Sequence, residues 1–99
     1  MTKTNHEIDR TIFQMHLLLR NYSFSHNKII QEFSRLIFNL ERMVSHIDDL
    51  QFNDLRTKIC PLLEQKLRRK NCPVICGMHH RICRILDCKE EDSDSKNHD

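Results

Sequence analysis

The chain has 99 residues, of which 38% are hydrophobic and 30% charged, and 16 Lys and Arg against 14 Asp and Glu leave a net charge of +2. This length fits one small domain, whose core is modest unless a metal or a second subunit adds to it. One Gly and two Pro leave little scope for a shaped substrate pocket or a Gly-rich phosphate loop, so the sequence predicts a protein that is not an enzyme.

No basic and apolar leader opens the chain, and its longest unbroken apolar runs, residues 17–19 and 36–38, are short. We therefore expect no secretion and no membrane partner, and a location in the nucleus, the cytoplasm or both. In a reducing compartment an odd number of cysteines, five, favours thiol or metal chemistry over disulfides.

The charge is distributed unevenly along the chain. Residues 1–54 carry six basic against seven acidic side chains, residues 55–84 carry eight against one, and residues 85–99 carry two against six. A basic middle and an acidic end indicate an anionic partner for the middle, or a tail that masks it. The chain also lacks Ala, the best helix former, which we interpret as a coding bias of small viral genomes.

The first predicted element is an amphipathic helix over about residues 5–22. Thr4 and Glu7 have capping-box spacing, and apolar side chains then recur at steps of four and three. These side chains are Ile8, Ile12, Met15, Leu19 and Tyr22.

A second helix is predicted from Ser25 to about Leu50, with Phe24 and Ile29 as a hydrophobic staple. Its apolar positions follow a heptad pattern: Ile30, Phe33, Ile37, Leu40, Val44 and Ile47, widened by Ile29, Leu36, Met43 and Leu50. Three apolar positions per heptad suit a bundle better than a two-stranded coil, and the short connection predicts an antiparallel hairpin. Either the third helix or a second chain covers the hairpin, and we favour a homodimer with four helices.

The opposite face of the second helix carries Lys28, Arg35 and Arg42, seven residues and about 10.5 Å apart. Such a row of cations could follow the phosphates of double-stranded RNA, which is recognised by shape and backbone. The alternative is an ordinary solvated face, because Glu32, Glu41 and Asp49 flank the row.

A third helix is predicted from Asn53 or Asp54 to about Asn71, kinked or restarted at Pro61. Its last turn contains Lys66, Arg68, Arg69 and Lys70, a pattern typical of a nuclear import signal or a phosphate-binding patch. Cations that favour the dipole of a helix C-terminus explain it equally well.

Residues 72–88 form a Cys/His-rich element that could bind zinc. Zinc prefers four thiolate and imidazole ligands at tetrahedral corners. The candidate ligands are Cys72, Cys76, His79 or His80, and Cys83, although Cys76 and Cys83 could instead pack a small core.

Leu86, Cys88 and Glu90 alternate with Asp87 and Lys89, and acidic residues follow. On an extended strand the first three would share one face. This Leu-x-Cys-x-Glu pattern resembles the peptide with which viral regulators dock onto retinoblastoma-type pocket proteins. The resemblance covers one pentapeptide and its acidic flank, and it implies that residues 86–90 bind such a partner.

The sequence thus predicts an all-α protein with three parts. These are a helical domain over residues 1–71, folded as an antiparallel hairpin or bundle, a Cys/His-rich zinc element over residues 72–88, and a disordered acidic tail over residues 89–99. We expect a small viral accessory protein that binds a host factor. The alternatives are a zinc-stabilised RNA-binding protein and a metal-free helical adaptor.

Overall fold

The computed structural model describes all residues except 1–2, 23, 25–26, 70–71 and 99. For residues 3 and 89–98 it describes the backbone but not the side chains. The described residues form helices and no strand, which confirms the all-α fold. Helix α1 spans Lys3–Asn21, α2 spans Asn27–Arg42, a 3₁₀ turn covers Val44–His46, α3 spans Asp49–Asp54, a π-helical turn covers Leu55–Ile59, α4 spans Cys60–Arg69 and α5 spans Pro73–His98.

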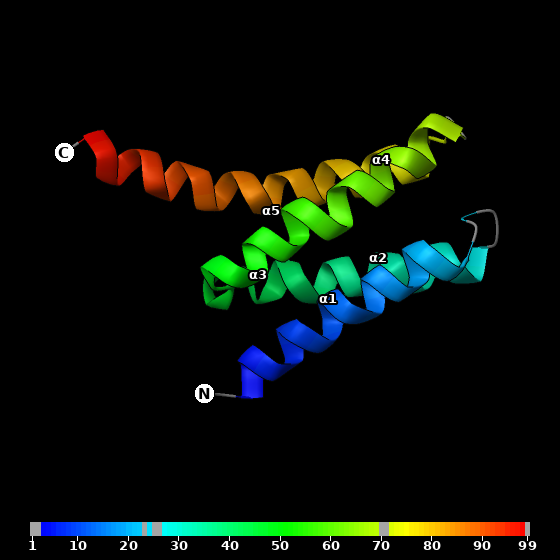
Figure 1. The fold of residues 1–99 in the computed structure, drawn as a ribbon, viewed down its shortest axis with the longest axis horizontal. Coiled ribbons are helices and arrows are strands. Elements are labelled where there is room, and N and C mark those ends of the chain that lie inside the picture. The colour runs from blue at the N-terminus through cyan, green and yellow to red at the C-terminus, as the bar shows by residue number, and fades with distance from the viewer. Residues whose placement is uncertain (1–2, 23, 25–26, 70–71, 99) are drawn as a thin grey trace.

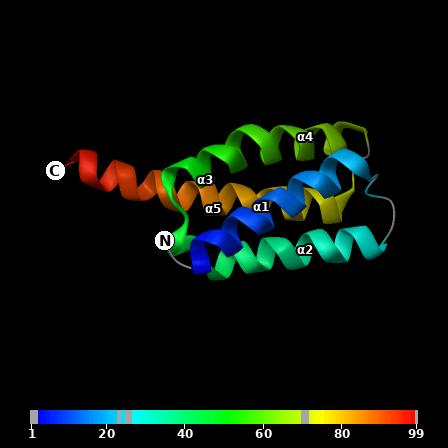
Figure 2. The same ribbon diagram turned by 60° about the horizontal axis from the view of Figure 1, so that its bottom comes forward.

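The helices form a bundle of four rods (Figures 1 and 2). One rod consists of α3, the π-helical turn and α4, which follow one another without a break. Helix α1 packs against α2 and against this rod, and α5 packs against α4 and α2. Successive rods run in opposite directions, so α1 and α4 run in the same direction and finish at the same end of the bundle (Figure 2).

All four rods contribute to one core. The predicted inward face of α1 is confirmed for its first four positions, whereas Tyr22 is 52% exposed. The α2 seam is buried at Phe33, Leu36, Ile37 and Leu40, and α5 adds Ile75, Met78, Ile82, Ile85 and Leu86.

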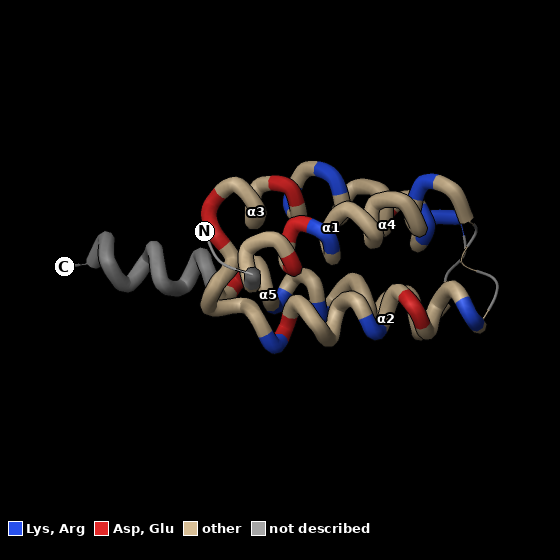
Figure 3. The backbone as a smooth tube through the Cα atoms, turned by 90° about the horizontal axis from the view of Figure 1, so that it is seen from below, with Lys and Arg blue, Asp and Glu red and all other residues tan. Residues whose placement is uncertain are grey.

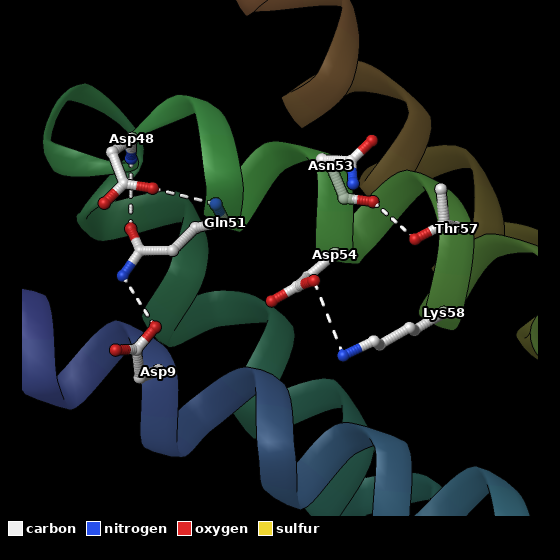
Figure 4. A network of polar contacts seen from close by, with 7 residues as sticks. All are labelled: Asp9, Asp48, Gln51, Asn53, Asp54, Thr57 and Lys58. Atoms are coloured by element: carbon white, nitrogen blue, oxygen red, sulfur yellow. Dashed lines mark hydrogen bonds and ion pairs between the residues drawn. The ribbon is translucent and has the colours of Figure 1, made fainter.

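The second helix ends earlier than predicted, because the residues after Arg42 cap another helix. Asp48 is the N-cap of α3: its carboxylate accepts from the Gln51 backbone N–H at 2.8 Å, and the Gln51 side chain accepts from the Asp48 N–H at 3.0 Å (Figure 4). The third helix therefore begins at Asp49, not at Asn53 or Asp54 as predicted. Leu50 falls on its outer side and is 78% exposed.

Pro61 does not interrupt the rod. Its ring would clash with the carbonyl four residues earlier in a regular α-helix, and the π-helical turn before it changes the hydrogen-bond pattern, since the Cys60 N–H donates to the Leu55 carbonyl. The Thr57 hydroxyl donates to the Asn53 carbonyl at 2.8 Å (Figure 4). Where the sequence predicts a kink or a restart at Pro61, the structure has a π-helical turn over Leu55–Ile59 and an α-helix that continues from Cys60.

All of residues 72–88 except Cys72 lie in α5, and their apolar side chains join the common core. The Arg81 guanidinium also ties α5 to α2, through Glu41 and the Ser34 hydroxyl. A second subunit is thus not needed to cover the hairpin, and the homodimer stays a prediction.

The predicted acidic tail covers residues 89–99, whose side chains lie outside the part that the structure describes. Within the described residues, no helix combines the length and apolar character that crossing a bilayer requires.

Candidate functional sites

The predicted zinc ligands lie in or directly before the first turns of α5, and among the described side chains Cys83 and His79 are in contact. The Cys83 sulfur lies 3.9 Å from Nδ1 of His79, and both side chains are half-buried. Cys76 and His80 are exposed, while Cys72 precedes the helix and accepts a hydrogen bond from the Cys76 N–H through its carbonyl.

Helix α4 contributes two further groups near this pair. The Glu64 carboxylate lies 3.5 Å from Nε2 of His79. Burial raises the pKa of the Cys60 thiol to about 11, and the neighbouring Cys83 and Glu64 add to this shift. Burial also raises the pKa of Cys83, and the negative charges of Asp87 and Glu64 raise it further by smaller amounts. Both thiols are therefore protonated near neutral pH.

The part of the chain that the structure describes contains no group of three or more His, Cys, Asp or Glu placed to hold a metal ion. The arrangement instead joins a neutral thiol pair to a His–Glu contact across the α4–α5 interface. Sequence reasoning missed Glu64 as a neighbour of Cys60, although a spacing of four puts both on one side of a helix. Zinc stays a prediction.

The predicted docking segment is helical in this structure, whereas the predicted docking mode takes it as an extended strand. Residues 86–90 lie within α5, and Leu86 belongs to the core with 7% exposure, whereas Cys88 is exposed. Residues two apart in a helix point to nearly opposite sides, so Leu86 and Cys88 share no face in this state. The Glu90 side chain lies outside the described part.

The cations of α2 form a row on its outer face, as predicted, but two of them have local partners. Arg35 forms an ion pair with Glu32, which lowers the pKa of the Glu32 carboxyl. The Arg42 guanidinium lies 5.8 Å from the centre of the exposed Phe38 ring. This row therefore carries less available positive charge than the sequence suggests.

The strongest gathering of cations lies at the end of the bundle where α1 and α4 finish. Figure 3 shows Lys and Arg there, and Asp and Glu at the opposite end, around the start of α3. Lys66, Arg68 and Arg69 form the last turn of α4, and Arg20 lies in the last turn of α1. Lys70 lies outside the described residues.

A pocket of about 230 Å³ opens between these two helix ends. Its lining residues are Leu19, Arg20, Leu62, Gln65, Lys66 and Arg69, and none of these described residues is acidic. Lys66 is fixed in place, because its ammonium group donates to the Tyr22 carbonyl at 2.9 Å and lies 5.6 Å from the Phe24 ring centre.

Sequence reasoning found the α4 cluster but missed Arg20 and Gln65. The sequence feature that could have revealed Arg20 is its position in the last turn of the first helix. In an up-and-down bundle the first and third rods finish at the same end, which brings Arg20 to the α4 cations.

Comparisons with known proteins returned no match: no family model, no curated protein and no solved structure resembles this chain.

Proposed function

We propose that this chain is a small, non-enzymatic regulatory protein of viral type that binds RNA through the basic end of its bundle. One observation carries the proposal. Arg20 and Lys66, from two helices, share a pocket with Arg69 and with no acidic lining residue among those described. An RNA backbone is the anionic partner that such a surface fits, since phosphate contacts supply most sequence-independent affinity.

The row on α2 supports the interface less than the basic end does. Helix α2 packs beside α1 and α5, so its outer face is turned away from α4. A cation that already has an acidic partner also adds little to the affinity for a polyanion, and Arg35 is such a cation because Glu32 compensates its charge. The interface is therefore assigned to Arg20, Lys66, Arg68 and Arg69.

The state of the thiols supports a binding role rather than catalysis. Among the described side chains, the Cys83 thiol contacts the His79 imidazole. Burial nevertheless raises the pKa of this thiol. A cysteine nucleophile acts as the thiolate and needs a lowered pKa. This pair is therefore poorly suited to nucleophilic chemistry.

A mobility-shift assay with double-stranded RNA over a series of salt concentrations tests the proposal. The double variant Arg20→Gln, Arg69→Gln should weaken binding and flatten the log–log salt slope by roughly one for each cation removed. The matched control is Arg35→Gln, Arg42→Gln, which removes the same charge from positions farther along α2 and should change binding little. Absence of RNA binding at the lowest salt concentration contradicts the proposal.

A second candidate function is docking of Leu86, Cys88 and Glu90 to a retinoblastoma-type pocket protein. It rests on the pentapeptide with its acidic flank and on the exposure of Cys88. Docking as an extended strand requires Leu86 to leave the core, which costs about 2 kcal/mol for a Leu side chain. A cost of that size lowers the apparent affinity roughly thirty-fold.

A pull-down with a pocket protein tests this second candidate. Glu90→Ala and Cys88→Gly should lose binding, whereas Asp87→Ala and Lys89→Ala, which point away from the partner on an extended strand, should retain it. Equal capture of all four variants excludes docking through this segment.

A further inference from the structure

The pocket between α1 and α4 has the size of a site for one charged group. Pockets for whole drug-sized ligands measure about 300–1,000 Å³, whereas this one measures about 230 Å³. Its volume suits a phosphoryl group with part of its sugar better than a whole nucleotide. Leu19 and Leu62 line it together with the polar side chains, so it has apolar walls as well as charges.

The donors differ in how firmly they are held. Lys66 uses one ammonium hydrogen on the Tyr22 carbonyl, which leaves two hydrogens for a ligand. Arg20 and Arg69 are exposed and can fold over a bound group from the two helix ends. Gln65 adds an uncharged amide donor. The acidic neighbour in the chain, Glu64, is engaged with His79 on the α5 side.

We infer that this pocket is a site for a phosphomonoester, namely the terminal phosphate of an RNA strand. The inference rests on the proposed RNA binding and deepens it. Three cations match the dianion that a phosphomonoester carries at neutral pH better than the single charge of a backbone diester. A concave site also admits a chain end more readily than a chain that must enter and leave.

Fluorescence anisotropy with one short RNA, prepared with a 5′-phosphate or a 5′-hydroxyl, tests the site. The phosphorylated strand should bind roughly ten-fold more tightly, and inorganic phosphate should compete where chloride at equal ionic strength does not. Arg20→Gln and Arg69→Gln should each abolish the preference. Arg35→Gln and Arg42→Gln, equal in charge change and farther along α2, should preserve it.

The outcomes separate this inference from the proposed function. Equal affinity for both RNA ends, with binding intact, overturns the phosphomonoester site and leaves RNA binding in place. If no RNA binds but inorganic phosphate raises the melting temperature of the parent and not of Arg69→Gln, the pocket is a phosphate site and RNA binding is overturned. Competition by a phosphoserine peptide stronger than by the phosphorylated RNA overturns the RNA assignment and retains the phosphomonoester.

Discussion

Arg81 of α5 and Glu41 of α2 form a two-pronged ion pair, with Nε 3.1 Å from Oε2 and Nη2 2.8 Å from Oε1. The same guanidinium donates to the Ser34 hydroxyl at 3.0 Å, so one side chain joins two helices that are far apart in sequence. The hydrogen bonds that Arg81 donates to the Glu41 carboxylate raise the pKa of Arg81 further, and the guanidinium stays charged at every working pH.

Arg81→Ala should lower the free energy of unfolding by about 1 kcal/mol, because the pair is bidentate but a third exposed to solvent. Urea denaturation followed by circular dichroism measures the change. The control is Arg84→Ala, an exposed arginine on the same helix, for which we expect almost no effect. Equal destabilisation by both variants would show that the pair adds nothing.

Gln51 is the polar residue on which the corner between α1 and α3 depends. It is 3% exposed, completes the cap with Asp48, and donates to the Asp9 carboxylate at 2.9 Å (Figure 4). Gln51→Ala should cost about 2 kcal/mol in unfolding free energy, since the buried Gln51 amide loses its hydrogen bonds to the Asp48 N–H and to the Asp9 carboxylate. The exposed Gln31 on α2 gives the control, Gln31→Ala, and a difference below 0.5 kcal/mol, roughly the scatter of surface substitutions, would contradict this role.

Cys60 should make stability depend on pH in the alkaline range. Its pKa is 9.0 for an ordinary thiol and about 11 in the fold, so the folded state keeps its proton where the unfolded chain has lost it. The contribution is fully present below pH 9 and is lost as the pH rises from 9 to 11.

Thermal melts of the parent and of Cys60→Ala over this pH range test the prediction. The melting temperature of the parent should fall more steeply with pH than that of the variant, whatever the starting stability of each. Parallel curves would show that Cys60 ionises equally in the folded and unfolded chain. The Cys60 thiol should also react with a disulfide reagent at pH 8 more slowly than the exposed Cys76.

Substitutions of Leu86 and Cys88 should differ in their effect on stability, because Leu86 is buried and Cys88 is exposed. Leu86→Ala should lower the unfolding free energy by about 2–4 kcal/mol, because the side chain lies in the core. Cys88→Ala, at an exposed position, should leave it almost unchanged. Chemical denaturation of both variants provides the measurement, and equal stabilities would mean that Leu86 is not part of the folded core.

The sequence alone determined the helical class and the inward faces of the first two helices. Apolar residues at steps of three and four, such as Ile8, Ile12 and Met15, define a buried face whatever the helix packs against. It did not reveal that α2 stops at Arg42. The apolar heptad continues past that point, and the competing signal, the Asp48 and Gln51 cap, is short and local.

Only the tertiary structure decided which functional residues meet. Cys76 and Cys83 are close in sequence but differ in exposure once α5 packs against α4, and Leu86 becomes a core residue because that packing favours a helix over an extended strand. Arg20 and Arg69 are far apart in sequence and line one pocket because their helices run in parallel and end together. Spacing along the chain describes one helix at a time, whereas a site between helices depends on their relative positions, which the burial of all their apolar faces together determines.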